Sequence, residues 1–195
     1  VAPQARIEIA GEAASWVSRG AEKLVAGLDA FGFAAEGRVA LDVGASTGGF
    51  TDVLLERGAT RVIAVDVGHG QLHPRLAADP RVVSLEQTDA RTITPALIGG
   101  PVGAIVADVS FISLEKALPA ALACAEAGAW LIALVKPQFE VGRGAIGKGG
   151  IVRDARARDA ASRRIADWLA SVPGWRVVGS VASPIAGGDG TAEEL

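Results

Sequence analysis

The sequence has one cysteine, no methionine and only two histidines among its 195 residues. A single cysteine excludes an intrachain disulfide and fits a reducing compartment, so we expect a cytoplasmic protein. Cys124 lies in an alanine-rich apolar segment, which indicates a core residue and not a catalytic thiol. Because no Cys/His cluster has the spacing of metal ligands, the sequence predicts no metal site.

Long apolar runs are also lacking. No run reaches the roughly 18 residues that a membrane-spanning helix needs, and no signal peptide is visible. The chain starts with valine and stops at Leu195, where another strand is expected to begin, so we expect a fragment trimmed at both ends. Residues 1–14 lack periodicity and are interpreted as a linker remnant. Residues 15–195 are expected to form one domain of ordinary globular composition.

Positive charge is scarce overall, and the net charge of −3 does not by itself indicate nucleic-acid binding. The distribution is uneven, because residues 136–164 carry a local charge of +5 and the remainder carries −8. The basic residues in this segment are Lys136, Arg143, Lys148, Arg153, Arg156, Arg158, Arg163 and Arg164. A solvated helix face explains part of this cluster, but a basic flank on an acidic body also steers a polyanion to one side.

Short apolar segments alternate with amphipathic ones. We expect strands at 38–43, 61–66, 82–86, 104–108, 130–135 and 175–182. We expect helices from the Trp16 region to Gly32, over 49–57, near 73–78, briefly after 94, over 114–122 with Pro119 tolerated or kinking it, and over 154–170. This alternation predicts an α/β fold with a mostly parallel sheet and helices on both faces.

Polar residues mark the carboxyl ends of four of the expected strands, namely Asp42, Asp66, Asp108 and Lys136. Ligands bind outside these ends in α/β sheets. If their strands are adjacent, Asp108 and Lys136 are most simply a salt bridge. Alternatively, the lysine holds and deprotonates a hydroxyl, with Lys23 as a second cation nearby.

A glycine-containing turn follows the first of these strands, within Leu41-Asp-Val-Gly-Ala-Ser-Thr-Gly-Gly-Phe50. Its glycines and the following helix N-terminus suit a nucleotide-like cofactor. Ser46 replaces a glycine of the dinucleotide pattern, and Asp42 would repel a pyrophosphate but tolerate the sulfonium and ammonium of S-adenosylmethionine. A plain strand–helix turn remains the alternative. Asp66, 22 positions after Gly44, is either a helix cap or a ligand for a ribose diol, and the combination favours an adenosine-bearing cofactor.

Several segments resemble the TlyA (hemolysin A) family of ribosomal RNA methyltransferases, within the wider FtsJ-like ribose methyltransferases. They are residues 18–24, 41–52, 64–72, 108–114, 134–140 and 147–154, and they cover nearly the whole chain in order. The resemblance implies a Rossmann-like class I methyltransferase fold that uses S-adenosylmethionine. It also implies 2′-O-methylation of cytidine in ribosomal RNA, with ribosomal subunits as partners.

The resemblance further implies a catalytic Lys-Asp-Lys-Glu set, which falls on Lys23, Asp108, Lys136 and Glu193. Lys136 is then the base at the 2′-hydroxyl and Asp108 its partner, while Lys23 and Glu193 position substrate and tune charge. The family pattern Gly-Asn-x-Glu-aromatic is broken twice at Gly190-Thr-Ala-Glu-Glu194, so Glu194 stays an alternative for the fourth position.

The implied cofactor-binding residues are Gly44, Ala45, Ser46, Thr47, Gly48, Gly49, Phe50, Asp66, Asp89 and Asp108, with Asp66 at the ribose. Asp89 is expected near the adenine, and an exposed turn acid is the alternative. His69 and His73, flanked by glycine and proline, are interpreted as RNA-facing or inert.

Family members normally carry an N-terminal RNA-binding module that this chain lacks, so we expect S-adenosylmethionine binding with poor methylation. Three other functions stay open: a membrane-active hemolysin, a nicotinamide dehydrogenase, and an RNA-binding domain with a relic cofactor pocket. The sequence has no amphipathic membrane stripe in favour of the first.

Overall fold

The computed structural model describes residues 16–142, 146–147, 149–187 and 190–195. Five parallel strands form one sheet in the order β3-β2-β1-β4-β5. They are β1 (Val39–Val43), β2 (Arg61–Val65), β3 (Val82–Leu85), β4 (Val102–Ala107) and β5 (Ala125–Ala133). Strand order reverses between β1 and β4, and in such sheets the crevice beyond that point takes the ligand. The linker remnant expected over residues 1–14 lies outside the described residues.

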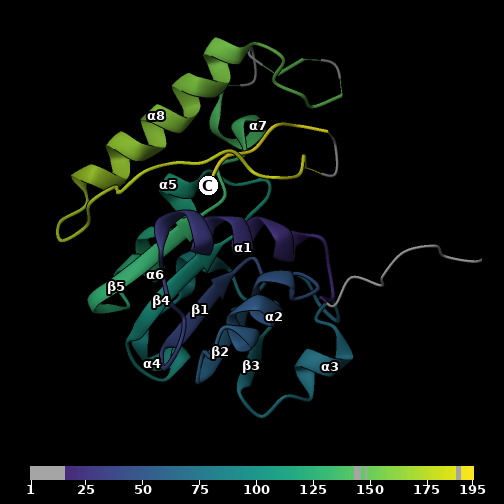
Figure 1. Cartoon of the computed structure of the whole chain (residues 1–195), viewed down its shortest axis with the longest axis vertical. Helices are drawn as coiled ribbons and strands as arrows, with labels where there is room; N and C mark the ends of the chain where they lie inside the picture. The colour runs from purple at the N-terminus through teal and green to yellow at the C-terminus, as the bar shows by residue number, and fades with distance from the viewer. Residues whose placement is uncertain (1–15, 143–145, 148, 188–189) are drawn as a thin grey trace, which may run out of the picture.

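Helices cover both faces of the sheet, which confirms the expected α/β fold (Figure 1). One face carries α1 (Gly20–Phe31), α2 (Gly49–Glu56) and α3 (Pro74–Ala77). The other carries the short 3₁₀ helix η1 (Ala90–Thr92), α4 (Pro95–Ile98), α5 (Leu114–Ala117), α6 (Pro119–Leu122) and α8 (Ala155–Ser171), while α7 (Pro137–Glu140) follows β5. Because side chains alternate along each strand, neighbours such as Ala40 and Leu41 enter opposite halves of the core.

Local signals account for the ends of the longer helices. Gly32 stops α1 in a left-handed conformation (φ 66°), and its N–H donates to the Leu28 carbonyl. The Asp154 carboxylate caps α8 by accepting from the Arg156 N–H. Ala161 and Ile165 of α8 are buried, as their helical spacing predicts.

Several expected elements differ in detail. The helix expected from the Trp16 region begins at Gly20, and the strand expected at 130–135 spans Ala125–Ala133. The helix over 114–122 is broken into α5 and α6 because Pro119 has no N–H to continue the ladder. Residues 175–182 form no strand beyond an isolated bridge at Ala182. A hollow of about 1070 Å³ separates this segment from β5, and the segment leaves Val177 and Val178 about half exposed.

The last described residues return to the sheet. Glu194 forms antiparallel bridges with both Val135, just after β5, and Ala182. The Val135 N–H donates to the Glu194 carbonyl at 2.7 Å, and the Glu194 N–H donates back at 3.2 Å. These bonds bring residues 193–195 to the carboxyl end of β5.

Candidate active site at the carboxyl edge of the sheet

Lys136 and Asp108 meet beyond the neighbouring strands β4 and β5, as the sequence predicts. The Lys136 Nζ lies 2.5 Å from Asp108 Oδ1, with side chains 12% and 23% exposed. The same ammonium donates to Ser110 Oγ at 2.9 Å. The lysine is thus held by two groups from the loop that follows β4, and one side of it remains open to solvent.

Lys23 and Glu193 form a second ion pair. Lys23 lies in the first turn of α1, and its Nζ is 2.5 Å from Glu193 Oε2, with both side chains buried. Glu194 points elsewhere and accepts a hydrogen bond from Ser180 Oγ at 2.7 Å. Of the two candidates for the fourth position, the structure therefore brings Glu193 and not Glu194 onto Lys23.

The two ion pairs are neighbours. Because Val135 and Glu194 pair in antiparallel register, the next residues, Lys136 and Glu193, lie opposite one another. All four members of the predicted Lys-Asp-Lys-Glu set are consequently gathered at one edge of the sheet. The set contains two ammonium groups and two carboxylates, so its formal charges balance.

The glycine turn connects β1 to α2 beside this set. Gly44 has a φ of +85°, and a Cβ there would lie 2.6 Å from the Asp108 carbonyl oxygen. Gly48 has a φ of +97°, and a Cβ there would meet the Leu76 and Leu72 side chains. Glycine is therefore required at both positions. The predicted residues Gly44, Ala45, Ser46, Thr47, Gly48, Gly49 and Phe50 form this turn and the start of α2, and Phe50 itself is buried in the core.

Asp66 fastens the turn to the end of β2. Its Oδ2 accepts from the Ser46 N–H at 2.8 Å, and its Oδ1 accepts from the Gly68 N–H at 2.7 Å. Each carboxylate oxygen has a further lone pair, so Asp66 can still accept from another donor. Asp89 is engaged locally: it caps η1 and binds the Arg91 guanidinium, which together lower its pKa to about 2.

Asp42 is a fully buried acid beneath this turn. Its Oδ2 accepts from Thr51 Oγ1 at 2.7 Å, and its Oδ1 has no hydrogen-bond partner among the described residues. Burial, with a smaller contribution from the charges of Asp108 and Asp66, raises its pKa to about 7 against the Thr51 hydrogen bonds. A buried acid with an unsatisfied oxygen near two other aspartates fits a ligand that carries positive charge.

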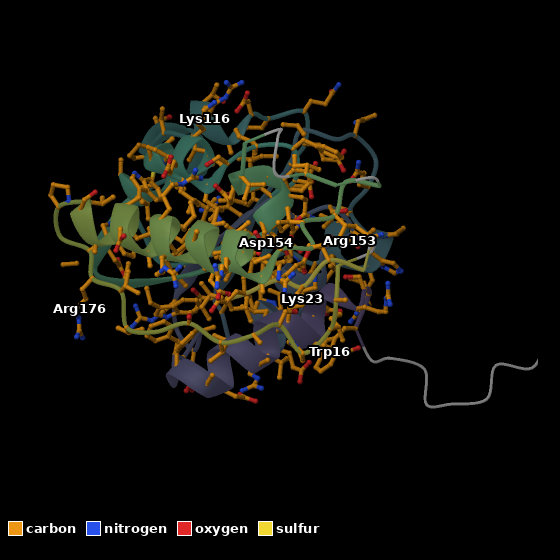
Figure 2. All side chains as sticks on the ribbon, turned by 90° about the horizontal axis from the view of Figure 1, so that it is seen from above. Trp16, Lys23, Lys116, Arg153, Asp154 and Arg176 are labelled. Atoms are coloured by element: carbon orange, nitrogen blue, oxygen red, sulfur yellow. The ribbon has the colours of Figure 1, made fainter. Side chains whose placement is uncertain are left out.

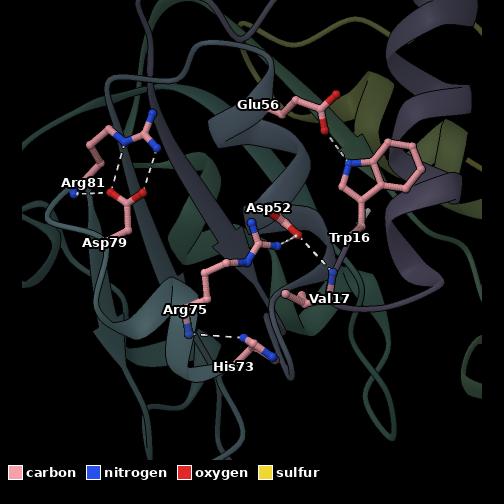
Figure 3. Close-up of polar contacts among 8 residues, drawn as sticks. All are labelled: Trp16, Val17, Asp52, Glu56, His73, Arg75, Asp79 and Arg81. Carbon is pink, nitrogen blue, oxygen red and sulfur yellow. Dashed lines mark hydrogen bonds and ion pairs between the residues drawn. The ribbon is translucent and has the colours of Figure 1, made fainter. Parts of the chain in front are cut away.

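The sequence did not predict the polar contacts that join two acids of α2 to Trp16, Val17 and Arg75; we call these contacts the clamp (Figure 3). Asp52 accepts from the Val17 N–H at 3.0 Å and from Arg75 Nη2 at 2.7 Å. One turn later, Glu56 accepts from Trp16 Nε1. The spacing of the two acids on one helix face was the available signal, but nothing in the sequence named their partners.

The histidines take structural roles. His73 caps α3 by accepting from the Arg75 N–H, and exposed His69 lies 3.2 Å from Glu86. Within the described ranges no group of three or more His, Cys, Asp or Glu side chains could hold a metal ion. No helix among these residues is long and apolar enough to cross a membrane.

The comparisons with known proteins agree with this geometry. The FtsJ-like methyltransferase family model matches residues 16–195. The 16S/23S rRNA (cytidine-2′-O)-methyltransferase TlyA of Mycobacterium tuberculosis is 55% identical over 92% of this chain and 66% of its own length. Hemolysin A of Brachyspira hyodysenteriae is 41% identical over 92% and 75%.

Solved structures extend the likeness to three dimensions. A candidate hemolysin from Lactococcus lactis superposes with a TM-score of 0.88 at 41% identity, covering 92% of this chain and 86% of its own. Methyltransferase structures only 18% and 20% identical share the Rossmann-like fold alone, with TM-scores of 0.55 and 0.58. The chain belongs to the FtsJ-like methyltransferases and, within them, to the TlyA (hemolysin A) family.

Proposed function

We propose that this chain is the methyltransferase domain of an S-adenosylmethionine-dependent 2′-O-methyltransferase that modifies cytidine ribose in cytoplasmic ribosomal RNA. The observation that carries the proposal is the Lys136–Asp108 pair, held beside the glycine turn and next to Lys23–Glu193. The names of the TlyA relatives supply the substrate class. The chain spans about two thirds of the length of the Mycobacterium relative, so the substrate of the whole protein is part of the proposal.

The residues around the glycine turn fit S-adenosylmethionine. Bound there, this cofactor supplies a methyl group already activated by a positively charged sulfur. The turn leads directly into the N-terminal end of α2, the Asp42 carboxyl has an oxygen without a partner beneath the turn, and Asp108 offers a carboxylate beside it. Asp66 retains lone pairs for the ribose hydroxyls, and Asp89 borders the adenine side.

Lys136 has the geometry of the base. As the neutral amine, its Nζ would take the proton of the ribose 2′-hydroxyl, while the cofactor held by the glycine turn would supply the methyl group and leave as the neutral thioether. Asp108 and Ser110 fix the nitrogen in place and stabilise the ammonium that results. Lys23 and Glu193 then orient the ribose, since their ion pair lies opposite Lys136 across the antiparallel bridge.

Phe111 offers a surface for a nucleobase. Its side chain is 92% exposed although its backbone has a φ of +66°, an uncommon conformation for a bulky residue. It follows Ser110 directly, and its ring lies 5.2 Å from that of Phe139. Exposed aromatic rings of this kind stack on unpaired bases, so Phe111 would hold the target base while its ribose faces Lys136.

The test is methyl transfer from labelled S-adenosylmethionine to ribosomal subunits, followed by mapping of the modified nucleotide. We expect 2′-O-methylcytidine with the wild-type chain and no transfer with Lys136→Ala, while the dissociation constant for the cofactor stays within about twofold. Lys116→Ala, at an exposed lysine of α5, is the matched control and should leave transfer unchanged.

Two results would overturn the proposal. Wild-type rates in Lys136→Ala would remove the base assignment, and cofactor binding without transfer to any subunit would favour an RNA-binding domain with a relic pocket. A liposome-leakage assay addresses the hemolysin name of the Brachyspira relative, and we expect no leakage.

A further inference from the structure

Glu140 is a buried carboxylate with three donors. Its side chain is 2% exposed and accepts from the Leu114 N–H at 2.9 Å, from Ser113 Oγ at 2.7 Å and from Arg164 Nη2 at 2.9 Å. Because Arg164 balances its charge and the other donors satisfy its oxygens, the acid is stable in this buried position. A carboxylate bound in this way joins three elements, namely α7, the start of α5 and α8.

Two of these elements follow closely after Lys136, the proposed base, and Asp108, its partner. Lys136 caps α7 and Glu140 closes that helix, whereas Asp108 leads through a short loop to Ser113 and Leu114. The two segments are therefore tied at both ends. The Lys136–Asp108 pair closes one end, and Glu140 closes the other.

Between these two ends, the tilted rings of Phe111 and Phe139 contact one another across the two segments, residues 108–114 and 136–140, which we call the bracket. Arg164 fixes the bracket to α8 and also reaches Glu115, with Nε 3.2 Å from Glu115 Oε1. Lys136 joins the two segments at one end through Asp108 and Ser110, and Glu140 joins them at the other end, so loss of the Glu140 contacts would remove the polar connection at that end.

We propose that Glu140 is a positioning residue that keeps the Lys136 ammonium on Asp108 and Ser110. The effect of Glu140 on catalysis rests on the proposed function, whereas its effect on the position of Lys136 does not. Removing the buried charge of Glu140 should let the Lys136 side chain leave Asp108 and Ser110. Its amine would then be exposed, while the glycine turn stays intact. Glu140 touches no part of the glycine turn in the contacts described, so cofactor affinity should not change.

The experiment measures the acetylation rate of Lys136 by a soluble amine-reactive ester, read by peptide mass spectrometry with exposed Lys116 as the internal reference. In Glu140→Gln we expect the Lys136 rate to rise at least fivefold relative to Lys116. The matched control is Glu115→Gln, which removes a partly exposed acid from the same arginine and should leave the rate unchanged. Methyl transfer should show a tenfold or greater fall in kcat, with KM for RNA and the cofactor dissociation constant within about twofold.

An unchanged Lys136 labelling rate in folded Glu140→Gln would overturn the inference. So would a parallel loss of cofactor binding, kcat and thermal stability, since that pattern indicates a general structural role. If Glu140→Gln does not fold, Arg164→Ala decides, because Arg164 is half exposed: a raised rate supports the inference, and an unchanged one overturns it. The labelling result stands even if the wild-type chain transfers no methyl group, so failure of the proposed function is distinguishable.

Discussion

Asp42 and Asp66 are aspartates at the carboxyl ends of neighbouring strands, but their carboxyl groups lie in different surroundings. Asp66 is partly exposed, and both of its oxygens accept backbone N–H groups. Asp42 is completely buried, and its one hydrogen bond to Thr51 does not offset the loss of water, so its pKa rises to about 7. The difference arises from depth, because Asp42 lies within β1 and Asp66 follows β2.

Asp42 makes the stability of the cofactor-free protein depend on pH. Its folded pKa of about 7 lies above the ordinary aspartate value of 3.8, so the folded state binds more protons between those values. Stability should therefore fall as pH rises from about 4 to 7, by at most about 4 kcal/mol. Asp42→Asn mimics the neutral acid and should remove this dependence. Urea unfolding at pH 5 and pH 8 checks it, and equal losses in both proteins would contradict the prediction.

Gly44 permits the closest backbone approach at the site. Gly44→Ala combines a positive φ, which costs roughly 1–2 kcal/mol, with a Cβ 2.6 Å from the Asp108 carbonyl oxygen, which must move. We expect lower stability and a loss of cofactor affinity of at least about tenfold.

The matched control for this substitution is Gly37→Ala. Gly37 also has a positive φ (+73°), but no atom lies within 4 Å of a Cβ there. It should lower the urea midpoint without changing the cofactor dissociation constant measured by calorimetry. Equal cofactor affinity in both variants would refute the steric argument.

At the scale of elements, α2 connects the segment before α1, which contains Trp16 and Val17, to the glycine turn. Its first residues close the turn, while Asp52 and Glu56 hold Val17 and Trp16. Ser18 packs so closely on Gly49 that a Cβ there would lie 2.2 Å from Ser18 Oγ. The segment before α1 is thus part of the wall of the site.

Asp52→Ala should release this segment. The substitution leaves the Val17 N–H and the Arg75 guanidinium without their shared acceptor, at a cost of about 1–3 kcal/mol. Urea unfolding measures the loss. Glu56→Gln is the control, because its amide oxygen still accepts from Trp16 Nε1. An unfolding midpoint equal to that of the wild type would show that the clamp does not stabilise the fold.

Elements whose signals are local were predictable from the sequence. Alternating apolar segments predicted the parallel sheet, Gly32 predicted the C-terminal end of α1, and the bounds of α8 were predicted to within a residue, whereas α1 begins at Gly20 and not in the Trp16 region. Residues 175–182 have the composition of a strand but pair with no sheet strand, because pairing depends on distant partners. The contacts of Glu140 and Asp52 were also unpredictable, since their partners are brought close only by the tertiary fold.

For the whole molecule, the important property is which of the arginines in and around α8 are exposed to solvent. Arg153, Arg156 and Arg163 are exposed, whereas Arg158 is partly buried and donates to the carbonyls of Val152 and Arg153. Figure 2 shows Arg153 at the start of α8 and Arg176, beyond its end, on the opposite side of the molecule. Arg143 and Lys148 of the predicted basic cluster lie outside the described residues.

The exposed arginines should contact RNA phosphates. Changing Arg153, Arg156 and Arg163 together to Gln should reduce the slope of log affinity against log salt by about 2 units, since each lost contact removes about 0.7–0.9. Filter binding of ribosomal RNA between low and moderate salt measures the slope. Arg176→Gln is the matched control and should leave it unchanged. A slope that falls equally in both would contradict a localised RNA surface.

The Lys23–Glu193 pair joins residues 170 positions apart. During translation at about 5–20 residues per second, roughly 10–30 s separate the synthesis of its two members. A nascent chain therefore contains Lys23 well before Glu193, the acid that pairs with it, is made. If the chain modifies ribosomes through the proposed Lys-Asp-Lys-Glu set, that set stays incomplete until synthesis has passed Glu193.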